Sequence, residues 1–125
     1  MATETAVTEA HILNTRRFRR YQLDVPVRLV VQTEDKTRII DGRGNELNEG
    51  GLCVQAGVEL KLEDTIEVEF TPPYTGEPLR ARAVVRNRNG YRYGLAFLLD
   101  TPEDCERVMD IRTALQGVGK VIPIQ

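Results

Sequence analysis

Hydrophobic and polar residues alternate along much of the chain from Leu23 onward. An apolar residue at every second position is the pattern of a strand with one buried and one exposed face. The clearest segment is 65–70, where Ile66, Val68 and Phe70 alternate with Thr65 and two glutamates, Glu67 and Glu69, which we expect on the solvent face. The same reasoning predicts strands over 25–31, 37–45, 52–56, 79–85 and 93–99.

Proline and glycine residues mark the connections between these strands. The segment TPPYTGEP, residues 71–78, predicts a loop. Asn89-Gly90 predicts a tight hairpin turn, because both residue types tolerate a positive φ. Several short strands with one-sided alternation favour a small antiparallel barrel or sandwich.

The pattern changes after residue 100 to that of a helix. Thr101 is a good N-cap, and Pro102 suits the first helical position. Acidic residues follow in the first turn, where they complement the helix dipole. Val108, Ile111 and Leu115 have helical spacing, with Cys105 and Met109 expected close to the same face. We therefore predict a C-terminal helix over about 102–116 that ends at Gly117.

The length of 125 residues supports one domain. Residues 1–15 are small and polar, and we expect a flexible tail there, followed by a single domain over 16–125. No apolar run is long enough to cross a membrane. The N-terminal residues do not resemble a secretory leader, and there are only two cysteines, Cys53 and Cys105, both expected as small buried thiols. We expect a cytoplasmic protein.

Charge narrows the range of functions. Lys+Arg number 17 and Asp+Glu 19, a net charge of −2, which argues against a general nucleic-acid binder. Arginine nevertheless provides 14 of the 17 cations, and nine of these arginines fall in two groups, four within 16–20 and five within 80–92. Its planar guanidinium pairs bidentately with phosphate or with a guanine edge. The first group is consistent either with a discrete anionic, planar ligand or with a solvated basic surface that keeps the domain soluble. An exposed strand face is the favoured interpretation of the second group.

The residues needed for catalysis are sparse, and we expect no enzyme. The one histidine, His11, falls in the predicted tail, which leaves no basis for a catalytic triad or a histidine metal site. Neither cysteine belongs to a CxxC pair, and no phosphate-binding glycine loop is present. We expect neither a metal nor a cofactor.

Two short motifs carry more information. Arg16 and Arg20 form an R-x-x-x-R pattern that is followed by Pro26-Val27. The segment 46–51, ELNEGG, leads into a strand, and the stretch YGLAF closes the β-rich region at 93–97. In these features the chain resembles the PilZ domain family, six-stranded antiparallel β-barrels that bind the second messenger cyclic di-GMP. The resemblance covers roughly residues 16–100.

The resemblance implies a fold and a set of ligand-binding residues. The fold is an all-β-dominated, six-stranded antiparallel barrel with one C-terminal α-helix. The family's second motif, [D/N]-x-S-x-x-G, places Glu46 at the acidic position, Asn48 at the serine position and Gly51 at the glycine. The implied cyclic di-GMP-binding residues, with Arg17 as a third arginine, are therefore Arg16, Arg17, Arg20, Glu46, Asn48 and Gly51.

These residues suit the chemistry of the ligand. Arginine can pair with the O6 and N7 acceptors of guanine and can stack on the purine ring. The Glu46 carboxylate can accept hydrogen bonds from guanine N1–H and N2–H₂. Asn48 keeps the donor and acceptor character of serine in a larger side chain. Because Arg16 and Arg20 precede the first strand, they can move as an arm when the ligand binds and so alter contact with a protein partner.

Two alternatives stay open at this point. The first is a nucleotide-free adaptor of the same fold that acts through protein–protein contacts, which the substituted second motif favours. The second is a small barrel that binds single-stranded nucleic acid, with Tyr91 and Tyr93 stacking beside Arg92. The sequence leaves the partner open, and the domain could be a monomer or a dimer.

Overall fold

The computed structural model describes residues 20–48, 50–73 and 76–122. The predicted tail 1–15, Arg16 and Arg17 lie outside the described residues. The elements, in chain order, are β1 (Arg20–Gln32), β2 (Thr37–Leu47), β3 (Gly51–Ala56), β4 (Thr65–Phe70), β5 (Leu79–Asn89), β6 (Arg92–Phe97), α1 (Pro102–Val118) and β7 (Lys120–Ile122).

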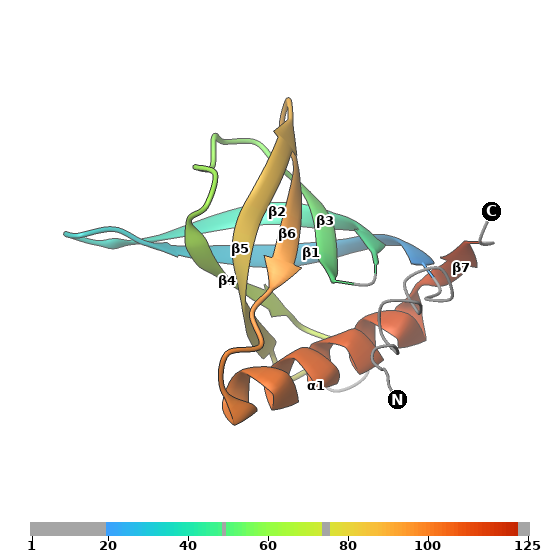
Figure 1. Cartoon of the computed structure of the whole chain (residues 1–125). Coiled ribbons are helices and arrows are strands. Elements are labelled where there is room, and N and C mark those ends of the chain that lie inside the picture. The colour runs from blue at the N-terminus through green and yellow to red at the C-terminus, as the bar shows by residue number, and fades with distance from the viewer. Residues whose placement is uncertain (1–19, 49, 74–75, 123–125) are drawn as a thin grey trace, which may run out of the picture.

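Six strands close into an antiparallel barrel in the order β1-β2-β3-β6-β5-β4, and β4 pairs with β1 to complete the ring. The six predicted strands are all present, so the predicted barrel is confirmed. A short seventh strand, β7, was not predicted and pairs antiparallel with the start of β1, where Arg20 lies opposite Ile122. The helix runs along one end of the barrel and leads into β7 beside the start of β1 (Figure 1).

The apolar positions of the alternating segments fill the barrel. The largest fully buried side chains include Leu29, Leu47, Leu52, Phe70 and Tyr93. Tyr93 is 1% exposed, and its hydroxyl donates to the Val58 carbonyl and accepts from the Leu60 amide. The core therefore also fixes the connection between β3 and β4.

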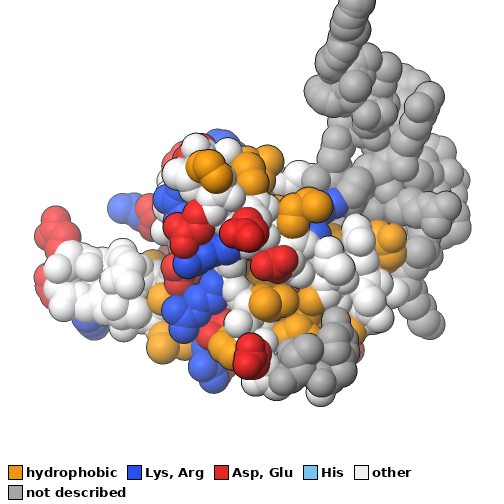
Figure 2. Space-filling view, turned by 90° about the horizontal axis from the view of Figure 1, so that it is seen from below, with side chains coloured by type: hydrophobic (Ala, Val, Ile, Leu, Met, Phe, Trp, Pro, Cys, Tyr) orange, Lys and Arg blue, Asp and Glu red, His pale blue; other side chains and the backbone are white. Residues whose placement is uncertain are grey.

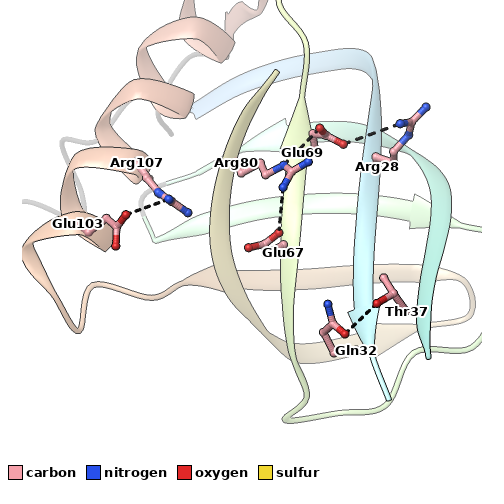
Figure 3. A network of polar contacts seen from close by, with 8 residues as sticks. All are labelled: Arg28, Gln32, Thr37, Glu67, Glu69, Arg80, Glu103 and Arg107. Atoms are coloured by element: carbon pink, nitrogen blue, oxygen red, sulfur yellow. Dashed lines mark hydrogen bonds and ion pairs between the residues drawn. The ribbon is translucent and has the colours of Figure 1, made fainter. Parts of the chain in front are cut away.

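The predicted exposure of two residues in the strand segments was wrong. Glu69 is buried rather than exposed, because Arg80 and Arg28 cover its carboxylate with nitrogens 3.4 and 3.9 Å away (Figure 3). The long arginine side chains come from the strands on either side of β4. Leu99 is exposed rather than buried, because β6 ends at Phe97 and the alternation ends with it.

The helix begins as predicted. The Thr101 side chain accepts a hydrogen bond from the Asp104 amide, and Pro102 opens the first turn. Asp104 is itself buried and takes two hydrogen bonds from Arg82 of β5, at 3.0 and 2.6 Å, which attach the first turn to the barrel.

The buried stripe of the helix lies one position away from Cys105 and Met109, and it consists of Asp104, Val108, Ile111, Ala114 and Leu115. Because adjacent helical residues point about 100° apart, Cys105 and Met109 are exposed, and their predicted burial was wrong. Cys53, the other cysteine, is only half-buried.

The helix end and the β5–β6 turn each lie further along the chain than the glycine pattern predicted. The helix continues through Gly117 and ends at Gly119, where an added Cβ would lie 2.6 Å from Leu23 Cδ2. The β5–β6 hairpin is confirmed, but Asn89 is the last strand residue, and the turn residues are Gly90, with φ of 67°, and Tyr91.

Within the described residues, no helix is long and apolar enough to span a bilayer.

Candidate functional site

Arg20 and Glu46 meet on the outer surface of the barrel. Arg20 is the first residue of β1, so the expectation that it precedes the first strand was wrong, because the strand begins five residues earlier than predicted and pairs there with β7. Glu46 is the penultimate residue of β2, opposite Gln22 in the β1–β2 register. The Arg20 Nε lies 2.8 Å from Glu46 Oε2. The arginine side chain is 57% exposed and that of the glutamate 19%, so the pair has one solvent-facing and one sheltered partner. Residues from the two predicted motifs therefore come together.

A β-bulge lies directly beside this pair. The register between β2 and β3 shifts between Gly44 and Glu46, which leaves Asn45 as the additional residue of β2. The β1–β2 pairing is irregular at the same level, between Gln22 and Val25. Bulges redirect side chains and are common beside binding sites.

Asn45 and Glu46 line a surface hollow of about 360 Å³, together with Gln22, Leu23, Gln55 and Arg92. The hollow thus draws on four strands, β1, β2, β3 and β6. Asn45 Oδ1 and Glu46 Oε2 are both buried and have no hydrogen-bond partner within the described part of the chain. The Arg20 Nε is close to Glu46 Oε2 but is not aligned for a hydrogen bond with it, so this oxygen retains its capacity to accept one.

Asn48 is engaged inside the protein. Its side-chain Oδ1 accepts a hydrogen bond from the Gly51 backbone N–H at 3.0 Å. Its backbone N–H donates to the Gly51 carbonyl, also at 3.0 Å. Its Nδ2 faces Cys53 Sγ at 4.0 Å. These contacts brace the connection from β2 to β3, a role that asparagine often has in turns.

Gly51 has a structural reason to be glycine. A Cβ at this position would lie 1.7 Å from the Leu95 carbonyl oxygen, because β3 and β6 approach closely there. Neighbouring Gly50 has nothing within 4 Å of a Cβ and carries no such restriction. Gly51 thus holds the turn against β6, which indirectly places Glu46 and Asn48.

Cys53 lies opposite Glu46 in the β2–β3 register. Burial raises the pKa of the Cys53 thiol, and the nearby Glu46 carboxylate raises it further. The thiol is therefore protonated and unreactive at neutral pH. Within the described residues, no cluster of three histidine, cysteine or carboxylate side chains could hold a metal ion.

The downstream arginines divide into two kinds. Arg80, Arg82, Arg86 and Arg88 each pair with an acidic side chain, namely Glu69, Asp104, Glu63 and Glu59, respectively. Arg92 makes no ion pair or hydrogen bond with any described residue, and it lines the hollow beside Glu46. The structure therefore places Gln22, Asn45, Gln55 and Arg92 around the same hollow as Glu46.

The family comparison agrees with the motifs. The sequence model of the PilZ domain matches residues 14–112, well over half of the chain. The chain belongs to the PilZ domain family. Members of this family are generally cyclic di-GMP receptors, and they are binding modules rather than enzymes.

A solved structure supports the fold of this PilZ domain. The PilZ domain of CeSA from a cellulose-synthesizing bacterium is similar with a TM-score of 0.62 and 19% sequence identity. The alignment covers 78% of this chain and 97% of that chain. No curated protein matched the sequence.

The described part of the face of the PilZ domain that is seen from below in Figure 2 is not continuously basic. Figure 2 shows basic and acidic side chains interleaved on the face seen from below. Tyr93 is in the core, and its hydroxyl is engaged there, so it cannot stack on a base as the nucleic-acid alternative requires. A larger hollow of about 690 Å³ lies near the β1–β2 hairpin, lined by Arg38, Lys61 and Arg88 among others, and includes none of the predicted site residues.

Proposed function

We propose that this PilZ domain is a receptor module that binds cyclic di-GMP beside the Arg20–Glu46 pair. Arg16, Arg17 and Arg20 supply the cationic arm, and the segment from Glu46 through Asn48 to Gly51 supplies the barrel side of the site. The observation that carries the proposal is the sheltered Glu46 carboxylate, which is ion-paired at 2.8 Å with the exposed Arg20 side chain.

The roles of these residues follow from their contacts. Glu46 Oε2 accepts from guanine N1–H or N2–H₂. The Arg20 Nε faces Glu46 while the side chain is 57% exposed, so its terminal nitrogens can reach a phosphate or a guanine edge. Asn48 and Gly51 act mainly by shaping the turn, because Asn48 Oδ1 is occupied and Gly51 packs against Leu95.

Binding would be transmitted through the start of β1. This segment lies between β2 and β7, so a ligand that draws Arg20 toward itself pulls on both neighbours. We propose that the resulting movement of the arm regulates a protein partner in the cytoplasm. Two free cysteines are consistent with a reducing compartment.

Isothermal titration calorimetry tests the receptor function. The full chain should bind cyclic di-GMP saturably, and the combined Arg16→Ala and Arg20→Ala variant should not bind. Arg43→Ala is the matched control, since Arg43 is an exposed β2 arginine that pairs with Asp24. Absence of heat from the unmodified chain at high ligand concentration would contradict the proposal.

The second candidate is the nucleotide-free adaptor. The observation that favours it is the Asn48 side chain, whose oxygen is used within the turn rather than offered to a ligand. An adaptor would show no response to cyclic di-GMP while its fold and thermal stability stayed normal. The same titration therefore separates the two candidates.

A further inference from the structure

The hollow between β1, β2, β3 and β6 is lined by hydrogen-bonding and charged side chains that belong to neither family motif, including Asn45 and Arg92. Two buried acceptors, Asn45 Oδ1 and Glu46 Oε2, have no hydrogen-bond partner among the described residues, although the Arg20 guanidinium lies 2.8 Å from the second. A buried acceptor without a donor, such as Asn45 Oδ1, is costly, and such atoms are uncommon in folded proteins. Both belong to side chains that line the same hollow, so one group with several N–H donors could satisfy both.

The Arg92 side chain supplies a positive charge on the β6 side of this hollow. Arg92 lies opposite Gln55 in the β3–β6 register, and both line the cavity with Glu46. Its four neighbours in the downstream group are paired with carboxylates, whereas Arg92 has no such partner in the described part of the chain. Its guanidinium is therefore available to a bound molecule.

The combination of acceptors and a guanidinium matches guanine better than adenine. Guanine presents N1–H and N2–H₂ donors on one edge and the O6 and N7 acceptors on the adjoining edge. Adenine offers N6–H₂ and no O6, so it cannot meet both sets of groups in the same orientation. A metal cation is disfavoured by the guanidiniums of Arg20 and Arg92 beside the carboxylate.

We propose that Asn45 and Arg92 are further ligand-binding residues that, together with Glu46, make this hollow a guanine pocket. This inference rests on the proposed receptor function and extends it to base specificity. Glu46 and Asn45 accept from N1–H and N2–H₂, and Arg92 donates to O6 and N7. The bulge at Asn45 is what places two successive β2 side chains on the same hollow.

Three ligands test these contacts: cyclic di-GMP, its inosine analogue, which lacks N2–H₂, and a 7-deaza analogue, which lacks the N7 acceptor. Asn45→Ala should weaken cyclic di-GMP binding about tenfold but leave binding of the inosine analogue nearly unchanged. Arg92→Ala should weaken cyclic di-GMP binding by a similar factor and have a much smaller effect on the 7-deaza analogue. Asn45→Asp, which keeps an acceptor, should retain discrimination between guanine and inosine.

The matched control is Arg86→Ala, which removes an exposed, ion-paired arginine outside the hollow and should leave all affinities unchanged. Thermal melts of each variant establish that it is folded. Equal losses for all three ligands would overturn the base contacts, because a structural or phosphate role is insensitive to the base edge. Wild-type affinity in both alanine variants would overturn the inference alone. Failure of the unmodified chain to bind cyclic di-GMP would overturn the receptor function and the guanine pocket together.

Discussion

The Arg112 guanidinium donates a hydrogen bond of 2.8 Å from Nη1 to the backbone oxygen of Asn48. Arg112 lies on α1 and Asn48 follows the last residue of β2, so this bond joins the helix to the turn that carries the second family motif. The same turn is fixed from inside by the Asn48–Gly51 hydrogen bonds. Helix and candidate site are therefore mechanically connected.

Loss of Arg112 should loosen the β2–β3 turn. Arg112→Ala should reduce the free energy of unfolding by about 2 kcal/mol, because a charged donor to a part-buried carbonyl is removed. Urea unfolding measures the loss. Arg107→Ala is the control, and it should cost less than about 0.5 kcal/mol, since Arg107 makes an exposed i,i+4 pair with Glu103. Equal effects of the two variants would show that the Arg112 bond does not hold the turn.

Gly51 and Gly50 form a matched pair for a steric test. Gly51→Ala places a Cβ where the Leu95 carbonyl stands, so β3 and β6 must separate, and we expect a loss of about 3 kcal/mol or more. Gly50→Ala should be nearly neutral, because its Cβ would meet open space. Thermal and urea unfolding compare the two variants. A stable Gly51→Ala protein would contradict the close β3–β6 approach.

The Arg82–Asp104 contact predicts a pH dependence of stability. The hydrogen bonds from Arg82 lower the pKa of Asp104 to about 2 from its ordinary 3.8. The folded state thus binds the proton less readily than the unfolded state, and the stabilisation is complete above about pH 4 and lost as the pH falls toward 2.

Thermal unfolding of Asp104→Asn measures this contribution. The difference in melting temperature between wild type and variant should be large near pH 6 and should shrink between pH 4 and pH 2. Glu103→Gln is the control, because Glu103 is exposed in the same helical turn. A wild-type-to-variant difference that does not depend on pH would refute the role of the Asp104 charge.

The Tyr93 hydroxyl connects the core to the β3–β4 loop. Tyr93→Phe leaves the Leu60 amide and the Val58 carbonyl without their partner, and we expect a loss of about 2 kcal/mol. Tyr91→Phe should be neutral, since Tyr91 is 52% exposed in the hairpin turn. Hydrogen exchange at the Leu60 amide reports the same bond locally, and unchanged protection in Tyr93→Phe would rule out its role.

Local patterns predicted most of the fold because they reflect burial on one face of each element. The alternation of Ile66, Val68 and Phe70 and the Thr101-Pro102 helix start needed no information from distant residues. Glu69 was misassigned because Arg28 and Arg80, from neighbouring strands, cover it. Met109 was misassigned because the side of α1 that packs on the barrel lies one position away from it, and Leu99 because β6 ends before it, at Phe97. Strand β7 is too short to show a period.

The candidate site was predictable in part. Motif spacing identified Arg20 and Glu46, which lie 2.8 Å apart although they are distant in sequence. It could not identify Asn45 or Arg92, because the first faces the hollow only through a bulge and the second only through strand pairing of β3 with β6. Nor could it show that Arg80 to Arg88 are paired and Arg92 is not, since those partners come from other segments.

Chemical-shift mapping with cyclic di-GMP on ¹⁵N-labelled full chain tests the central claim most directly, because it asks both whether the ligand binds and where. The account predicts saturable shifts for amides of Gln22, Asn45, Glu46, Gln55 and Arg92 around the smaller hollow. Amides of Thr33, Leu60 and Leu62, at the larger hollow, should not move. Shifts confined to that second group, or no shifts at millimolar ligand, would contradict a cyclic di-GMP site at the Arg20–Glu46 pair.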